Sequence, residues 1–311
     1  VAETTKFNEI YLLKGDDGEK TINLNAHDAG LKGTLVDNGS GKATFTMKEL
    51  SVGDSVSIGG KNYTIGSTAA DAQKIVTGQE KAGGKVTVNG VEYTYNDTDK
   101  KWKDAAGADV QIGTGAAAGK IVIGDGDKVS DGTTTLTAMT DKKDATGAAK
   151  ADGVDDNDNS VISAEKAYSL AKDELVAANH IGDTENTAAV AQDTTNKNVF
   201  TITTGSAKVA NTLSFSLHVG ADADMTNKIT VDIDTMNSAN LGIKGLNVTD
   251  KNGTAATYAI DAISDAISKV SSQRSALGAV QNRLEHTIDN LDNISENTSS
   301  AESRIRDTDM A

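Results

Sequence analysis

The stretch from Tyr258 to Asp309 has the pattern of one long helix, with no Pro and a single Gly at position 278. Its apolar residues recur in alternating steps of three and four, as in a coiled coil. A helix of about fifty residues is roughly 75 Å long, so it cannot cover its own apolar stripe and has to pack against other helices. The residues expected to make this packing are Ile260, Ile263, Ile267, Val270, Leu277, Leu284, Ile288 and Leu291, with Ile305 continuing the spacing.

Polar residues interrupt this heptad pattern. Arg274 and Gln281 occupy core positions, and Ser295 and Glu302 mark a frayed end. Polar core residues weaken a two-stranded seam, but they also fix register and select partners, and the second role is the better attested. The small residues around Gly278 let another backbone approach closely. The pattern therefore indicates a packing surface for partner helices.

Composition excludes several classes of function. The chain has 311 residues, enough for two or three domains, but only 4% aromatic residues and no Cys or Pro. Without Cys there is no disulfide framework and no thiolate metal site. A net charge of −15 argues against binding to nucleic acid or to an anionic membrane. No apolar run reaches the length of a membrane span, and no cofactor is expected.

Residues 15–206 have a pattern typical of small antiparallel β units, because short runs of β-prone residues alternate with Gly, Asn and Asp. Asn89-Gly90 predicts a type I′ hairpin over residues 86–95, and Gly59-Gly60 predicts a similar one over residues 55–66. One helix is expected from Val161 to Ala178, with Ser163 as its cap or an alternative cap at residue 159 or 160. Residues 67–78 favour a short helix, and residues 140–159 are expected to be a mobile loop.

Apolar and polar residues alternate strictly over residues 213–220 and 228–234, which predicts a further hairpin with one buried face. Leu213, Phe215, Leu217 and Val219 fall on one side of the first strand. Ile229, Val231 and Ile233 repeat the scheme in the second. This hairpin directly precedes the long helix in the sequence.

No catalytic constellation is found in the sequence. The four His residues lie outside metal-ligand spacing, and neither a nucleophile elbow nor a phosphate-binding loop is present, so we predict that the protein is not an enzyme. Asp155, Asn157 and Asn159 have the spacing that opens a Ca²⁺ loop. However, Ser160 stands where such loops need Gly. The sequence favours an acidic helix N-terminus for this segment and leaves these three residues as a weak Ca²⁺ candidate, so no metal is predicted.

Three segments resemble bacterial flagellin. SQRSALGAVQNRLEHTIDNLDN (272–293) with AESRIRDTDMA (301–311) is similar to the C-terminal rod of that family, most closely to flagellins of Gram-positive bacteria of the clostridial kind. TTKFNEIYLLKG (4–15) resembles an N-terminal flagellin segment, with Glu9 standing where Gly is usual. LSFSLHVGADADMTNKITVDIDTMNSANLGI (213–243) looks like the hairpin and following turn of the same rod.

The resemblance implies an elongated, multidomain α+β fold. Residues 1–14 and 207–311 would form a discontinuous rod domain. Residues 15–206 would form a variable, mainly β outer insert containing one helix, with possible subdomains at about 15–118 and 119–206. The N-terminal rod helices and the terminal coiled-coil segments of the family have no counterpart in this sequence, so the chain is expected to be a fragment.

By the same resemblance, the expected function is structural. The protein would be a secreted, extracellular subunit of the flagellar filament that polymerises with itself and meets an export chaperone and the filament cap. An alternative is a ligand of the Toll-like innate receptor for flagellin, with Gln281, Arg283, Leu284 and Glu285 as contacts. A weaker alternative is an adhesin that binds host glycans through the insert. Tyr93, Tyr95 and Trp102 are the nearest approach to an aromatic platform, but their pattern favours a place in the hairpin core.

Overall fold

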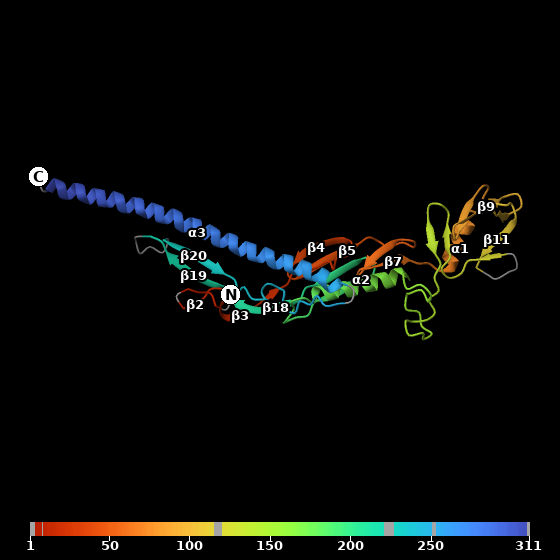
Figure 1. Cartoon of the computed structure of the whole chain (residues 1–311), viewed down its shortest axis with the longest axis horizontal. Helices are drawn as coiled ribbons and strands as arrows, with labels where there is room; N and C mark the ends of the chain where they lie inside the picture. The colour runs from red at the N-terminus through yellow and green to blue at the C-terminus, as the bar shows by residue number, and fades with distance from the viewer. Residues whose placement is uncertain (1–3, 8, 115–119, 221–226, 251–252, 310–311) are drawn as a thin grey trace.

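The computed structural model describes residues 4–7, 9–114, 120–220, 227–250 and 253–309. The molecule is elongated, with a long helix at one end and β-rich lobes at the other (Figure 1). The predicted α+β class is confirmed, because several small sheets with two shorter helices are followed by one long C-terminal helix. Among the described residues, no helix is both long and apolar enough to cross a membrane.

The inner part of the molecule contains the two-stranded pairs and the long helix. Its elements are β1 (Lys6–Phe7), β2 (Ile10–Tyr11), β3 (Asp16–Asn23), β18 (Ser206–Asn211), β19 (Leu213–His218), β20 (Lys228–Ile233) and α3 (Thr254–Asp309). β3 pairs antiparallel with β18, so the chain leaves for the outer lobes and returns from them along one ribbon. β19 and β20 form the predicted hairpin, with Leu213 opposite Ile233 and both side chains buried.

The middle lobe follows this ribbon. It consists of β4 (Gly33–Gly39), β5 (Lys42–Met47), β6 (Ser55–Ile58), β7 (Lys61–Ile65), β15 (Val161–Ile162), α2 (Ala164–Asn179), β16 (Ala189–Gln192) and β17 (Val199–Thr203). Phe45 and Phe200 are cross-strand partners on β5 and β17, and both are fully buried in its core. The apolar face of α2 covers this core with Ala167, Ala171 and Leu175.

The helix predicted from Val161 to Ala178 begins later in the structure. Val161 and Ile162 form β15, which pairs parallel with β7 almost a hundred residues earlier in the sequence. Ser163 is the N-cap, and its hydroxyl accepts the N–H of Lys166 at 3.2 Å. The cap was therefore predicted correctly, whereas the two preceding residues are drawn into a sheet by a long-range partner.

The distal lobe lies at the far end. Its elements are α1 (Ala69–Gly78), β8 (Lys85–Val88), β9 (Val91–Asn96), β10 (Lys101–Lys103), β11 (Asp109–Gly113), β12 (Lys120–Val122), β13 (Lys128–Ser130) and β14 (Thr135–Thr137). The strands form one sheet in the order β12-β11-β10-β9-β8-β13-β14. Asn89 and Gly90 join β8 to β9 with φ values of 51° and 83°, which confirms the predicted type I′ turn. Gly59 and Gly60 do the same between β6 and β7.

The segment 140–159 connects the two lobes. It follows a defined path that carboxylates fix by accepting backbone N–H groups. Asp141 accepts from Asp152 and Gly153, each at 2.9 Å, and Asp156 accepts from Lys142 and Lys143. The many Asp residues of this loop therefore act as local backbone acceptors.

Glu9 lies in the turn between β1 and β2 with a φ of 67°, in the left-handed region that costs a non-Gly residue about 1 kcal/mol or more. We expect Glu9→Gly to increase the hydrogen-exchange protection of the Leu12 amide, which donates to Thr5 across this hairpin. The expected gain is about fivefold, for about 1 kcal/mol. Glu9→Val is the matched control and should lose protection, and equal protection in the two variants would contradict the strain argument.

Candidate functional site

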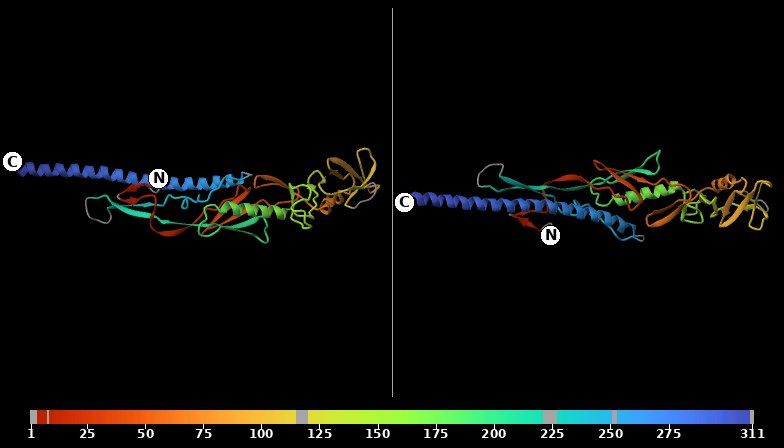
Figure 2. Two further views of the ribbon diagram at one scale, coloured as in Figure 1. Left: turned by 60° about the horizontal axis from the view of Figure 1, so that its bottom comes forward. Right: turned by 90° about the horizontal axis from the view of Figure 1, so that it is seen from above.

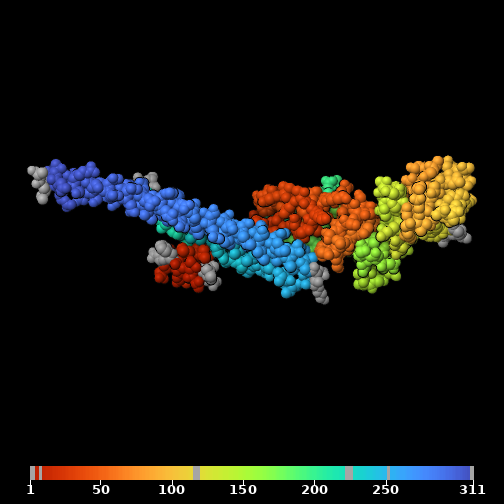
Figure 3. Space-filling model, turned by 45° about the horizontal axis from the view of Figure 1, so that its top comes forward, coloured from red at the N-terminus to blue at the C-terminus, as the bar shows by residue number. Residues whose placement is uncertain are grey.

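The long helix α3, with 56 residues, is the longest of the described elements. It starts beside the middle lobe, runs along β20 and then continues beyond every other described element (Figures 1 and 2). Figure 3 shows that its C-terminal half projects from the molecule without a covering layer on the face in view. A helix of this length that is covered over only its first turns presents a large surface for further packing.

One face of α3 is buried near its N-terminal end. Tyr258, Ala259, Ala262 and Ala266 lie on it, and the small Ala side chains let the helix come close to the elements beneath. Tyr258 is part of the same core cluster as Phe45 and Phe200. The helix α3 therefore contributes a side chain to the core of the middle lobe.

Polar contacts continue this inner face toward the hairpin. The Lys269 ammonium donates to the Asn240 carbonyl at 2.9 Å, and burial lowers the pKa of Lys269. Four residues later, the Gln273 amide donates to the Asp232 carbonyl at 2.9 Å. The sequence analysis did not predict a role for either residue. A signal was present, because Ala262, Ala266, Lys269 and Gln273 are spaced in steps of three and four and therefore lie on one face of the helix.

The predicted packing stripe lies on a different face. Ile260, Ile263, Ile267 and Val270 are solvent-exposed, as is Ile288. Successive residues of a helix are about 100° apart, and a seven-residue repeat drifts by about 20° per heptad. The stripe thus starts on the outer face and winds inward, so that Leu277, Leu284 and Leu291 are half-buried. Its first half forms an apolar outer surface, which we call the outer stripe (Ile260, Ile263, Ile267 and Val270).

The predicted receptor contacts lie on the projecting part of α3. Gln281, Arg283 and Glu285 are exposed, and the Gln281 amide donates to the Glu285 carboxylate at 2.9 Å. Leu284 is half-buried. The structure thus leaves three of these four side chains accessible on the molecular surface.

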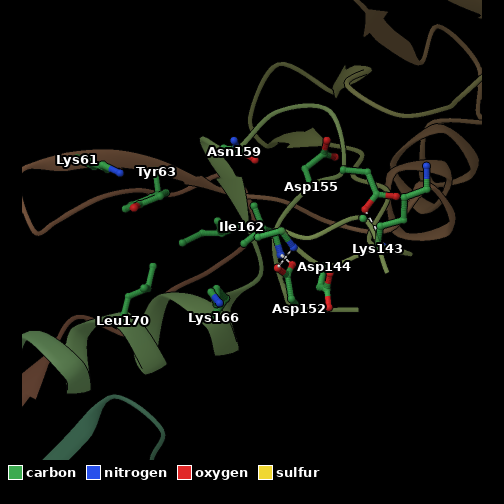
Figure 4. Close-up of a pocket in the computed structure, with 14 residues that line it drawn as sticks. Lys61, Tyr63, Lys143, Asp144, Asp152, Asp155, Asn159, Ile162, Lys166 and Leu170 are labelled. Carbon is green, nitrogen blue, oxygen red and sulfur yellow. Dashed lines mark hydrogen bonds between the residues drawn. The ribbon is translucent and has the colours of Figure 1, made fainter. Parts of the chain in front are cut away.

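A cavity of about 530 Å³ lies between β7, α2 and the 140–159 loop (Figure 4). Lys61 and Tyr63 come from β7, and Lys166 and Leu170 come from α2. The carboxylate of Asp152 in its wall accepts backbone N–H groups from Ala145 and Val154. This arrangement serves to order the loop, and it does not aim a nucleophile and a base at one point.

The segment with Ca²⁺-loop spacing does not converge on an ion. The Asp155 carboxylate is only 3% exposed and accepts three backbone N–H groups, those of Thr140, Asn157 and Asp158. The Asn157 amide donates to Asp125. Within the described ranges, no group of three His, Cys, Asp or Glu residues is arranged to hold a metal ion.

The aromatic residues considered for glycan binding are core residues. Tyr93, Tyr95 and Trp102 belong to the buried cluster of the distal lobe, where Trp102 is 3% exposed. Tyr95 and Trp102 pack edge to face, with ring centroids 5.2 Å apart. Buried rings offer no stacking surface to a sugar, so this platform is absent from the described surface.

Comparison with known proteins places the similarity in the long helix. Residues 260–311 match the family described as bacterial flagellin C-terminal helical region. This part of the chain is therefore similar to the C-terminal helical region of flagellins.

Several flagellins and filament proteins are similar to about a third of the chain. The chain is 54% identical over 97 residues to the putative flagellin YvzB of Bacillus subtilis (strain 168), covering 31% of this chain and 59% of that protein. It is 46% identical over 101 residues to a flagellin of Clostridium tyrobutyricum, covering 32% of this chain and 26% of that one. It is 42% identical over 106 residues to a flagellar filament 33 kDa core protein of Treponema phagedenis, covering 32% of this chain and 36% of that one. The chain therefore spans less than two thirds of the length of each of these relatives.

Proposed function

We propose that this chain is a structural subunit of a bacterial flagellar filament and assembles through α3. The observation that carries the proposal is a flagellin-type helix whose outer stripe is apolar and exposed over several turns. Exposed apolar surface of this extent on a monomer marks an interaction site. Identical subunits joined by heterologous contacts that do not close build a helical polymer.

The proposed division of the chain follows from this role. We infer that residues 1–14 and 207–311 form the part of the subunit that packs in the filament wall, and that residues 15–206 face outward. Within the outer part, the two buried clusters separate the middle lobe from the distal lobe. The boundary expected near residue 118 falls inside the distal cluster, between Ile112 and Ile123, so we propose instead that the distal lobe spans about 67–139.

The proposed location is the extracellular filament, and the proposed role involves no catalysis. The acidic composition, with a net charge of −15, would keep the outer surfaces of neighbouring filaments apart. We also propose a subunit of the Gram-positive type, as the sequence resemblance implies, with an export chaperone and a filament cap as its further partners.

Electron microscopy tests the filament proposal. A flagellin-deficient bacterium expressing this protein should regain helical filaments that an antibody against the distal lobe decorates along their outside. Cells that export the protein but form no filaments would refute the proposal. Filaments that the antibody does not reach would refute the outward placement of residues 15–206.

Recognition by the Toll-like receptor for flagellin is a second candidate, supported by the accessible Gln281, Arg283 and Glu285. Arg283→Ala should weaken receptor signalling by the secreted protein severalfold, since Arg side chains are frequent hot spots of interfaces. Unchanged signalling at equal protein concentration would count against these contacts.

A further inference from the structure

The cavity between β7, α2 and the 140–159 loop has the size of a ligand pocket. Its volume of about 530 Å³ falls within the usual range of about 300–1,000 Å³. Lys and Asp side chains make up much of its wall, and Tyr63, Ile162 and Leu170 form a smaller apolar part. An apolar ligand would remove water from the charged groups without replacing its hydrogen bonds, so the cavity fits a polar ligand.

The wall of this cavity is fixed before any ligand binds. Its carboxylates each accept at least two backbone N–H groups of the 140–159 loop, and they belong to Asp144, Asp152, Asp155 and Asp156. Gly153 holds the loop against α2, since a Cβ at this position would lie 2.7 Å from the Cβ of Lys166. A preorganised wall lowers the ordering cost of binding.

The hydrogen-bond donors of the wall differ from its carboxylates, because they remain available. Lys61 and Tyr63 from β7 lie opposite Lys166 and Leu170 from α2 (Figure 4). The Tyr63 ring is half-buried, since it packs partly against the core of the middle lobe and also lines the cavity. The groups without a hydrogen bond or ion pair in the described part of the chain are the side chains of Lys61, Lys143, Lys166 and Asn159 and the hydroxyl of Tyr63.

The charges of the wall favour a neutral ligand. Three Lys and four Asp residues line the cavity, so a ligand with a net charge of either sign would meet groups of its own sign. A neutral saccharide suits this mixture, because each hydroxyl group accepts from an ammonium or amide group and donates to a carboxylate. The C–H face of a sugar ring also packs on an aromatic ring, which Tyr63 provides.

We propose that this cavity binds a neutral saccharide, with Tyr63 as the stacking ring and Lys61, Lys166 and Asn159 as donors to its oxygen atoms. The site lies in the middle lobe and is separate from the buried aromatic cluster of the distal lobe. It gives the chain a recognition activity beyond its structural role, and it does not depend on assembly into a filament.

Titration of the full chain with small saccharides, followed by NMR of the backbone amides, tests the proposal. The neutral probes are lactose, maltose and diacetylchitobiose, with sialyllactose as an acidic probe and alanylalanine as a zwitterionic one. At least one neutral saccharide should saturate at millimolar concentration and shift the amides of residues 61–63, 143–159 and 166–170. Failure of all three neutral probes would overturn the proposal, as would shifts confined to other residues. Tighter binding of either charged probe would refute the neutral class.

Tyr63→Leu is the first variant, because it keeps an apolar side chain against the core and removes the aromatic ring. The dissociation constant of the best neutral saccharide should rise about tenfold. The Ile65 amide, which donates to the Asp54 carbonyl, should keep its hydrogen-exchange protection and so report that β7 is intact. An unchanged dissociation constant would overturn the role of the ring and with it the proposal.

Lys166→Met is the second variant, since it removes the ammonium group and retains the length of the side chain. Binding should weaken severalfold. Lys172→Met is the matched control, because Lys172 is also a half-buried residue of α2 but does not line the cavity. The control should bind as the wild type does, and an equal loss of affinity in the two Lys variants would contradict the assignment of the site.

Discussion

The double substitution Ile263→Asp, Ile267→Asp should abolish filament formation. It should leave the folded subunit nearly as stable as the wild type. The two side chains are 44% and 60% exposed, so their replacement changes the free energy of unfolding by no more than about 0.5 kcal/mol each. In an assembled filament the same positions would be buried against a neighbouring helix. An unpaired carboxylate there costs several kcal/mol, which is enough to prevent growth.

The measurement combines electron microscopy of cells expressing the variant with thermal unfolding of the secreted protein. Ser264→Asp with Ser271→Asp is the matched control, because it adds the same charge to exposed polar positions of α3. The control should form filaments. Wild-type filament length in the Ile263→Asp, Ile267→Asp variant would show that the outer stripe is not an assembly surface.

Tyr258 gives the second large effect, because two substitutions should act in opposite directions. The side chain is 6% exposed within the core of the middle lobe. Tyr258→Ala should lower the free energy of unfolding of this lobe by about 3–5 kcal/mol, through lost burial and a residual cavity. Its hydroxyl has no hydrogen-bond partner among the described residues, so Tyr258→Phe should raise that free energy by about 1 kcal/mol.

Urea denaturation followed by hydrogen exchange at β5, β17 and α2 checks both values in the part of the molecule where they arise. Distal-lobe amides serve as the internal control and should not change. If Tyr258→Ala left the middle-lobe amides as protected as in the wild type, the α3 helix would not contribute to this core.

Local sequence signals predicted much of the secondary structure. Asn89-Gly90 and Gly59-Gly60 define their turns because few other residues accept positive φ at both central positions. Ser163 defines the start of α2 because its hydroxyl accepts a hydrogen bond from the backbone N–H of Lys166 in the first turn, which has no partner within the helix. The heptad spacing likewise predicted α3 and its need for partners, and the flagellin resemblance covered the same region.

Long-range pairing could not be predicted in the same way. β15 joins β7 across almost a hundred residues, and neither strand carries a local mark of its partner. The sequence predicts one continuous seam from the outer stripe to Leu277, Leu284 and Leu291, whereas a straight α-helix turns these three half-buried residues away from the face of the outer stripe. The sequence favoured a core position for the aromatic residues of the distal lobe, and their place in the buried cluster confirms it.

The sequence by itself therefore determined the elements whose causes lie within a few residues: the turns, the cap of α2, the alternation of β19 and β20, and the length and apolar pattern of α3. Only the tertiary structure decided which faces are covered, that Tyr258 enters the core of the middle lobe, and that the side-chain amide of Asn157 meets the carboxylate of Asp125, 32 residues earlier in the chain. The physical reason is the separation along the chain over which each kind of interaction acts. Backbone preferences act between neighbours in the chain, whereas burial and the proximity of charges depend on residues that the fold alone brings together.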